Sequence, residues 1–192
     1  MKKKLFVVAI LVIFLLIGCT YGLTPTIESE EENIAATFIE QFPEVNSEHS
    51  FVEIDEYEVV RKLRQEEKAI IFFGFEECPK CHHVAIALAE AAIDNELDRI
   101  DYFNPFDIRN RNTREYQEIV EFLADILPDN EKGQPTLNVP LVVFIDEGEI
   151  VFYHMGSVRG ASTRENVLTD EQQTALMRIF DNKIKQFVIE ED

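Results

Sequence analysis

Two cysteines three positions apart restrict the possible folds of this chain most strongly. The motif Cys78-Pro79-Lys80-Cys81 lies between the apolar run 68–75 and the alanine-rich stretch 84–93. The first segment is typical of a buried strand and the second of a helix. A helix that begins at Cys78 places this sulfur at the positive end of the helix dipole, which favours its thiolate. Because the thiolate is the nucleophile in disulfide exchange, this placement predicts a redox-active cysteine pair.

The rest of the chain alternates predicted strands with predicted helices. The expected strands are 51–54, 68–75, 99–103, 141–145 and 149–153, the last two joined by a turn at 146–148. The expected helices are 55–65 with Asp55 as its cap, 84–93, 112–127 and a last one capped by Thr169-Asp170, with Leu176, Ile179, Phe180 and Ile184 as apolar positions. This order predicts an α/β fold with a mixed central sheet flanked by helices.

The N-terminus has the pattern of an export signal. Three lysines precede the apolar run Leu5–Ile17, which as a helix would span roughly 20 Å, short of the ~30 Å hydrocarbon core. A signal peptide, residues 1–18, is therefore favoured over a permanent membrane span. The run ends in Leu-Ile-Gly-Cys19, which resembles a bacterial lipobox and implies a lipid-anchored protein on the extracytoplasmic face of the cell membrane. An uncleaved anchor and an ordinary secretory signal are the alternatives, and both also export the chain.

Residues 19–50 are predicted to be a tether, and residues 51–192 the folded domain. The tether contains the acidic run 28–32 and a potential short helix at 33–42, with Ile34, Phe38 and Phe42 on one face. Pro43 would end that helix.

The cysteine count and the charge narrow the function further. If Cys19 carries lipid, Cys78 and Cys81 are the remaining two of three cysteines, and their short loop makes a poor structural staple. Without residues 1–18 the chain has 15 basic and 37 acidic residues, a net charge of −22. Such an acidic protein is not expected to bind nucleic acid or anionic lipid surfaces.

The segment from Val139-Pro140 to Gly156 resembles the second half of a thioredoxin, in which a cis-proline opens a strand and a glycine follows the hairpin. The resemblance covers residues 51–158 and implies a thioredoxin-like three-layer fold in which Pro140 is cis and faces the Cys78–Cys81 pair. The motif Phe-Gly-Phe-Glu-Glu-Cys-Pro-x-Cys, the lipid anchor and the long middle segment are most similar to bacteriocin-transport accessory-type proteins.

Three departures from the thioredoxin pattern lie around the cysteines. Glu77 occupies the usual tryptophan position, Phe72 that of a buried aspartate, and Pro79-Lys80 replace the familiar Gly-Pro. The fold is still expected, whereas the kinetics and the redox potential of thioredoxins are not.

The predicted activity is disulfide exchange with protein or peptide partners, with no cofactor beyond the cysteine pair. Cys78 forms the mixed disulfide and Cys81 resolves it. Lys80 and the helix N-terminus favour a Cys78 thiolate, Glu76 and Glu77 oppose it, and His82 adds to it if protonated. The pattern leaves the direction of exchange open.

Three alternatives remain. Cys78-Pro-Lys-Cys81-His82 also matches the attachment motif for c-type haem, with Met155 or His154 as a distal ligand. A zinc site would combine the two cysteines with His82 or His83 and with His154. A binding module for an exported peptide would use a groove, for which the candidate aromatic residues are Phe73, Phe75, Phe103 and Phe106. Partner specificity is expected in the long segment 107–133.

Overall fold

The computed structural model describes residues 37–65, 67–158 and 168–189. They all belong to one compact unit, residues 32–192. The predicted signal peptide, Cys19 and most of the predicted tether lie outside the described residues. No helix in these three ranges has the length and apolar character needed to cross a bilayer.

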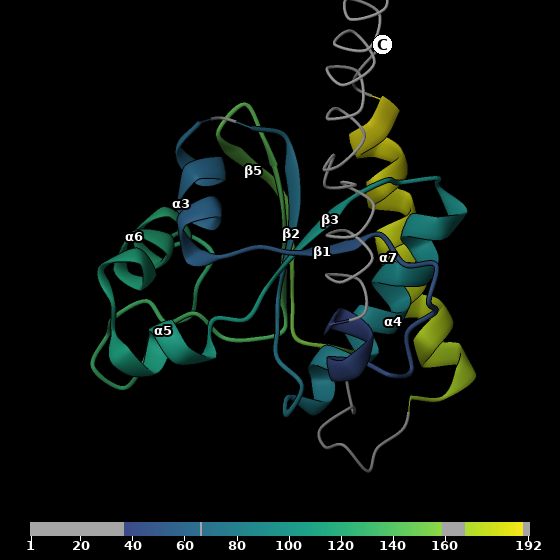
Figure 1. The fold of residues 1–192 in the computed structure, drawn as a ribbon, viewed down its shortest axis with the longest axis horizontal. Coiled ribbons are helices and arrows are strands. Elements are labelled where there is room, and N and C mark those ends of the chain that lie inside the picture. The colour runs from purple at the N-terminus through teal and green to yellow at the C-terminus, as the bar shows by residue number, and fades with distance from the viewer. Residues whose placement is uncertain (1–36, 66, 159–167, 190–192) are drawn as a thin grey trace, which may run out of the picture. The chain divides into compact units, whose positions relative to one another are not determined.

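A five-stranded mixed sheet forms the centre of the domain, in the order β1-β3-β2-β4-β5 (Figure 1). The strands are β1 (Phe51–Glu53), β2 (Ala69–Phe73), β3 (Ile100–Phe103), β4 (Leu141–Asp146) and β5 (Glu149–Met155). The first three are parallel, β4 is antiparallel to β2, and β5 is antiparallel to β4. The carboxyl end of β2 therefore lies beside the amino end of β4, where Phe73 pairs with Leu141.

Helices cover both faces of the sheet (Figure 1). On one side lie α3 (Glu56–Arg64), α5 (Phe106–Arg111) and α6 (Arg114–Phe122), and on the other lie α4 (Pro79–Asp94) and α7 (Asp170–Ile189). This is the predicted thioredoxin-like three-layer α/β arrangement. Two predicted helix caps are confirmed: the Asp55 side chain accepts from Glu58 N at 2.8 Å, and that of Thr169 accepts from Gln172 N at 3.2 Å.

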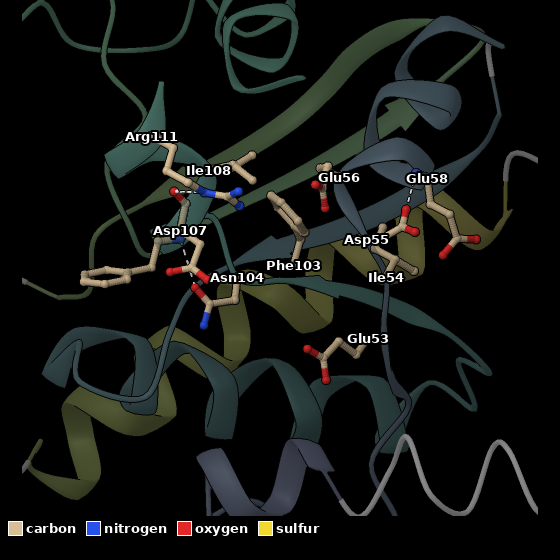
Figure 2. Close-up of a pocket in the computed structure, with 11 residues that line it drawn as sticks. Glu53, Ile54, Asp55, Glu56, Glu58, Phe103, Asn104, Asp107, Ile108 and Arg111 are labelled. Atoms are coloured by element: carbon tan, nitrogen blue, oxygen red, sulfur yellow. Dashed lines mark hydrogen bonds between the residues drawn. The ribbon is translucent and has the colours of Figure 1, made fainter. Parts of the chain in front are cut away.

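A pocket of about 640 Å³ opens at the carboxyl ends of β1 and β3 (Figure 2). The parallel β2 ends at the same edge of the sheet, and the segment with both cysteines follows it. The pocket and the cysteine pair therefore share one edge of the domain.

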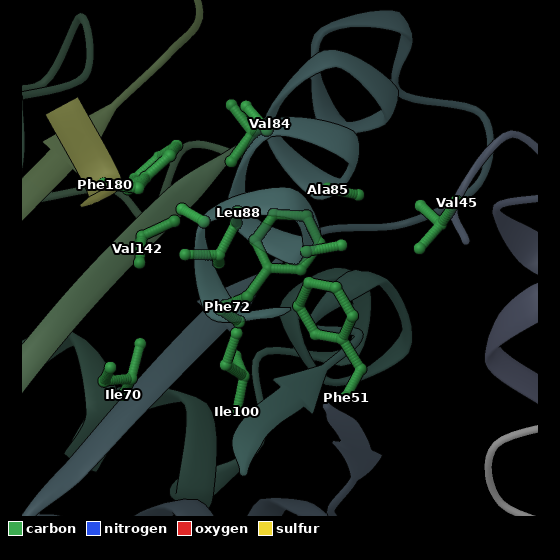
Figure 3. Packing of buried hydrophobic residues seen from close by; sticks show 14 of the residues in the cluster. Val45, Phe51, Ile70, Phe72, Val84, Ala85, Leu88, Ile100, Val142 and Phe180 are labelled. Carbon is green, nitrogen blue, oxygen red and sulfur yellow. The ribbon is translucent and has the colours of Figure 1, made fainter. Parts of the chain in front are cut away.

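The continuous apolar character of β2 is explained by a core on each face of the strand. Ile70 and Phe72 belong to the cluster under α4 and α7, and Figure 3 shows Phe72 among side chains of α4 and β1. Ala69, Ile71 and Phe73 belong to the cluster under α3 and α6. A strand buried on both faces has no polar alternation, which is why it reads as an apolar run.

The helix predicted over 112–127 is present but shorter in the structure. There, α6 spans only Arg114–Phe122, and a separate helix that was not predicted, α5, precedes it, because Asn112 between the two adopts a left-handed conformation at φ 48°. Thr113 then begins α6 by accepting a hydrogen bond from Tyr116 N at 3.2 Å. Asparagine tolerates this conformation well, so it ends a helix without a glycine. In α7, Ile179 is 37% exposed and does not belong to the buried face predicted for it.

Part of the predicted tether packs into the core. Residues 37–41 are helical, as predicted for this stretch, and Phe38 and Phe42 have no exposed surface. The Phe38 ring lies 4.2 Å from that of Phe51 and meets Tyr102 edge-on at 4.9 Å. The packed domain therefore begins before residue 51, the boundary expected from the sequence.

Candidate active site

Cys78 and Cys81 are joined by a disulfide at the point where the chain leaves β2 and enters α4. Their Cα atoms are 5.2 Å apart. Cys78 retains 8% of its surface, whereas Cys81 is fully buried. An attacking group from outside therefore reaches the Cys78 sulfur more readily than the Cys81 sulfur.

Local sequence explains why the helix begins at the first cysteine. Pro79 occupies the first turn of α4, where a missing N–H costs no helical hydrogen bond. Cys78 is the N-cap, and its sulfur accepts a hydrogen bond from Cys81 N at 3.2 Å. This N–H and the helix dipole would stabilise negative charge on Cys78 when the disulfide opens.

The Val139–Pro140 peptide bond is cis, as the resemblance implied. Pro140 is buried at the start of β4, at the sheet edge where β2 ends. Its carbonyl accepts a hydrogen bond from Gly156 N at 2.8 Å, which ties the end of the β5 hairpin to this edge. Val139 packs against the cluster that contains both cysteines.

His82 connects the cysteine loop, residues 74–78 between β2 and α4, to the segment before β1 that contains Glu44. Its Nε2 lies 2.7 Å from the carbonyl oxygen of Glu76, and its Nδ1 lies 3.0 Å from Glu44 Oε2. The ring also packs on Phe42 at 5.1 Å. Because both nitrogens face acceptors, the ring can donate to both only when it carries two protons. These contacts suit His82 to position the loop, and the predicted stabilisation of the Cys78 thiolate stays a prediction.

His83 links the first turns of α4 to the segment after β5. Its Nδ1 lies 3.4 Å from Ser157 Oγ. Burial lowers the pKa of His83, and the neighbouring charge of His82 lowers it further. A neutral His83 therefore borders the same edge of the domain as Gly156 and Pro140.

The charged neighbours of the disulfide are unequally exposed. Glu76 and Glu77 lie on the surface, and Lys80 is partly buried. Burial raises the pKa of Tyr102 strongly, and the charges of Glu53, Glu76 and Glu77 raise it further. The Tyr102 hydroxyl donates to Gln41 Oε1 at 2.7 Å.

Phe72 belongs to the core cluster of the two cysteines, so an aromatic ring occupies the position at which thioredoxins place a buried acid. The buried Asp101 instead bonds Lys62 of α3 at 3.1 Å and Arg99 at 2.7 Å. Because α3 covers the other face of the sheet, Asp101 is separated by the sheet from the cysteine cluster.

His154, a candidate zinc or haem ligand, lies on β5 against α7. Its ring meets Phe180 edge-on at 5.2 Å, and its Nε2 is buried without a hydrogen-bond partner among the described residues. Burial lowers the pKa of His154 more than a backbone hydrogen bond to Gly156 raises it.

The lowered pKa of His154 predicts a pH-dependent stability. The ordinary histidine value is 6.5, so the unfolded chain takes up this proton at a higher pH than the folded chain. The burial of His154 therefore lowers the free energy of unfolding progressively as the pH decreases below about 6.5. We expect a smaller fall in His154→Phe, measured by urea unfolding at several pH values. If the free energy of unfolding fell equally in both proteins, His154 would not be the source of this pH dependence.

The geometry does not favour the haem or the zinc alternative. Haem attachment consumes both cysteine sulfurs, and here they are bonded to each other. Both ring nitrogens of His82 face other partners. Within the described ranges, no three histidine, cysteine or acidic side chains converge closely enough to hold a metal ion.

The chain was also compared with known proteins. No protein-family model matches it, and no curated protein matches it. Function is therefore inferred from the disulfide, from its surroundings and from the resemblance of residues 51–158 to thioredoxins.

Sequence patterns did not reveal several residues of this site. Glu44 lies 38 positions before His82, and Ser157 lies 74 positions after His83. Neither belongs to a motif, so nothing in the local sequence pairs them with the cysteine loop. The Gly156 position was indicated, because a glycine after the hairpin is part of the thioredoxin pattern.

Proposed function

We propose that the protein is a thiol-disulfide oxidoreductase of the thioredoxin-like superfamily that exchanges disulfides with exported proteins or peptides. One observation carries the proposal: the Cys78–Cys81 disulfide caps α4 with its more accessible sulfur at the helix N-terminus. The lipobox-like sequence at Cys19, outside the described residues, supports a lipid-anchored position on the extracytoplasmic face. The similarity to bacteriocin-transport accessory-type proteins supports an exported peptide as the partner.

The exchange uses the two sulfurs in a fixed order. A substrate thiolate attacks Cys78, the Cys78–Cys81 bond breaks, and Cys81 leaves as a thiolate. A second substrate thiolate then attacks the substrate sulfur of the mixed disulfide and releases Cys78. The substrate loses two electrons and gains a disulfide, and the protein becomes a dithiol. The reverse sequence reduces a substrate disulfide, with Cys81 resolving the mixed disulfide.

The first test is the redox equilibrium of the pair. We expect Cys78 and Cys81 to convert together, in one two-electron step, when the ratio of reduced to oxidised glutathione is varied. The measurement uses the full chain with Cys19→Ser in detergent, with thiol labelling read by intact mass. The potential indicates the direction of exchange, since about 30 mV corresponds to a tenfold change in the equilibrium constant.

Two outcomes would count against the oxidoreductase. In the first, the Cys78 and Cys81 thiols never form the internal disulfide. In the second, the disulfide forms but no ratio of reduced to oxidised glutathione reduces it. Either result would favour the binding module, the second candidate. That candidate is supported by Phe106, which is 43% exposed although Phe73 and Phe103 of the same predicted groove are buried. A Cys81→Ala protein that keeps its cellular function would favour it as well.

A further inference from the structure

The pocket at the carboxyl ends of β1 and β3 has an acidic lining. Its carboxylates belong to Glu53, Asp55, Glu56, Glu58 and Asp107. Figure 2 shows them on both sides of Phe103, with Asp107 across from the acids of β1 and α3. A volume of about 640 Å³ is large enough for several side chains of a bound molecule.

The charge of the pocket is not neutralised from within. Arg111 is the only basic residue in its lining, and its Nε donates to the backbone oxygen of Asp107 at 3.4 Å. No described cation forms an ion pair with any of the five acids. Four of the acids lie at helix N-termini, where the helix dipole stabilises their negative charge: Asp55, Glu56 and Glu58 at α3, and Asp107 at α5. No helix dipole stabilises Glu53 in this way, because it lies on β1, and burial raises its pKa.

A contact between two phenylalanine rings connects the pocket to the cysteine loop. Phe106 lines it, and the Phe106 ring lies 5.4 Å from that of Phe75, whose carbonyl accepts a hydrogen bond from Cys78 N at 3.1 Å. The charges of Glu53 in the pocket and of Glu77 in the loop both raise the pKa of Tyr102. An exposed aromatic ring on the lining of the acidic pocket therefore contacts the loop that leads to the disulfide.

The arrangement of the carboxylates favours an extended occupant. Among the described residues, no three acids converge at distances suitable for one metal ion. The acids are instead distributed around a cavity with an exposed phenylalanine at its rim. Lysine and arginine side chains fit such a lining, since their ends pair with carboxylates and their stems pack on apolar surface.

We propose that this pocket docks a basic segment of the substrate, next to the cysteine that reacts with Cys78. The proposal rests on the proposed function and names the class of its substrate: a peptide or protein with lysine or arginine near its thiols. Complementary charge raises the rate of encounter and holds the substrate thiol beside the Cys78 sulfur.

The test compares two peptides that carry the same pair of cysteine thiols. One has three lysines beside the cysteines and the other has three glutamines. Each peptide is mixed with the oxidised protein carrying Cys19→Ser, and the conversion of its thiols to a disulfide is followed by acid quenching and chromatography. Each rate is divided by the rate of the same peptide with hydroxyethyl disulfide, because lysines also activate thiols directly.

We expect the lysine peptide to react about tenfold faster at low salt, as complementary charge at a docking site typically provides. The pocket variant Glu53→Gln/Glu56→Gln/Asp107→Asn should lose most of this preference. The control variant Glu90→Gln/Asp98→Asn/Glu149→Gln changes the net charge equally at exposed positions outside the pocket and should keep it. Added salt should reduce the preference in the wild type. Equal rates for both peptides, or equal losses in the two variants, would overturn the proposal.

A binding measurement separates docking from exchange. The lysine peptide with serines in place of its cysteines is titrated into the same three proteins by calorimetry. Weaker binding to the pocket variant alone supports docking, even if no protein oxidises either peptide; that result would overturn the oxidoreductase instead. Equal binding to all three proteins would overturn the docking site whatever the exchange rates show.

Discussion

In the Cys81→Ser protein, Cys78 is expected to form a mixed disulfide with a substrate peptide that persists. In Cys78→Ser, the remaining thiol should react on the order of tenfold more slowly, because the Cys81 side chain is fully buried. Cys78 should react faster, because it retains 8% of its surface and lies at the N-terminus of α4, which stabilises its thiolate. The wild-type protein should form the adduct only transiently, since its second thiol releases the peptide.

The measurement uses a peptide whose cysteine is joined to thionitrobenzoate. Attack by a protein thiol releases the coloured thionitrobenzoate and leaves the peptide on the protein, where intact mass detects it. All three proteins carry Cys19→Ser, so that only Cys78 and Cys81 can react. A stable adduct in the wild type, or equal rates in the two single variants, would refute the assignment of attacking and resolving roles.

Phe38→Ala is expected to lower the free energy of unfolding by about 3–5 kcal/mol, the usual cost of removing a fully buried phenylalanine. Phe38 has no exposed surface and packs against the rings of Phe42, Phe51 and Tyr102. The loss follows because the neighbouring rings cannot collapse completely into the cavity. Urea unfolding of both proteins measures the difference.

The matched control for Phe38 is Tyr57→Ala. Tyr57 is 66% exposed, so its truncation should change the free energy of unfolding by no more than about 0.5 kcal/mol. If Phe38→Ala behaved like this control, residues before 51 would not be part of the packed domain, and the boundary expected from the sequence would stand. The same segment carries Glu44, so its packing also supports the contact with His82.

Sequence patterns were sufficient for the features that depend on near neighbours along the chain. The apolar run of β2, the caps at Asp55 and Thr169 and the proline after Cys78 each report a local requirement of backbone or burial. The order of these elements then predicted the mixed sheet. The cis bond before Pro140 was implied by resemblance, because X-Pro bonds in general are far more often trans.

The remaining features depend on contacts between residues distant in the chain. Glu44 and the Glu76 carbonyl both contact His82. Phe106 contacts Phe75 and lines the acidic pocket. Both arrangements form only after β1, β2 and β3 align in the sheet. Phe38 is buried for the same reason, since the core that covers it is assembled from distant elements. Periodicity and caps describe the chain over a few residues and carry no information on such pairings. Local sequence therefore indicated where the disulfide lies, whereas the surroundings that would select its substrate arise from the packing of the whole domain.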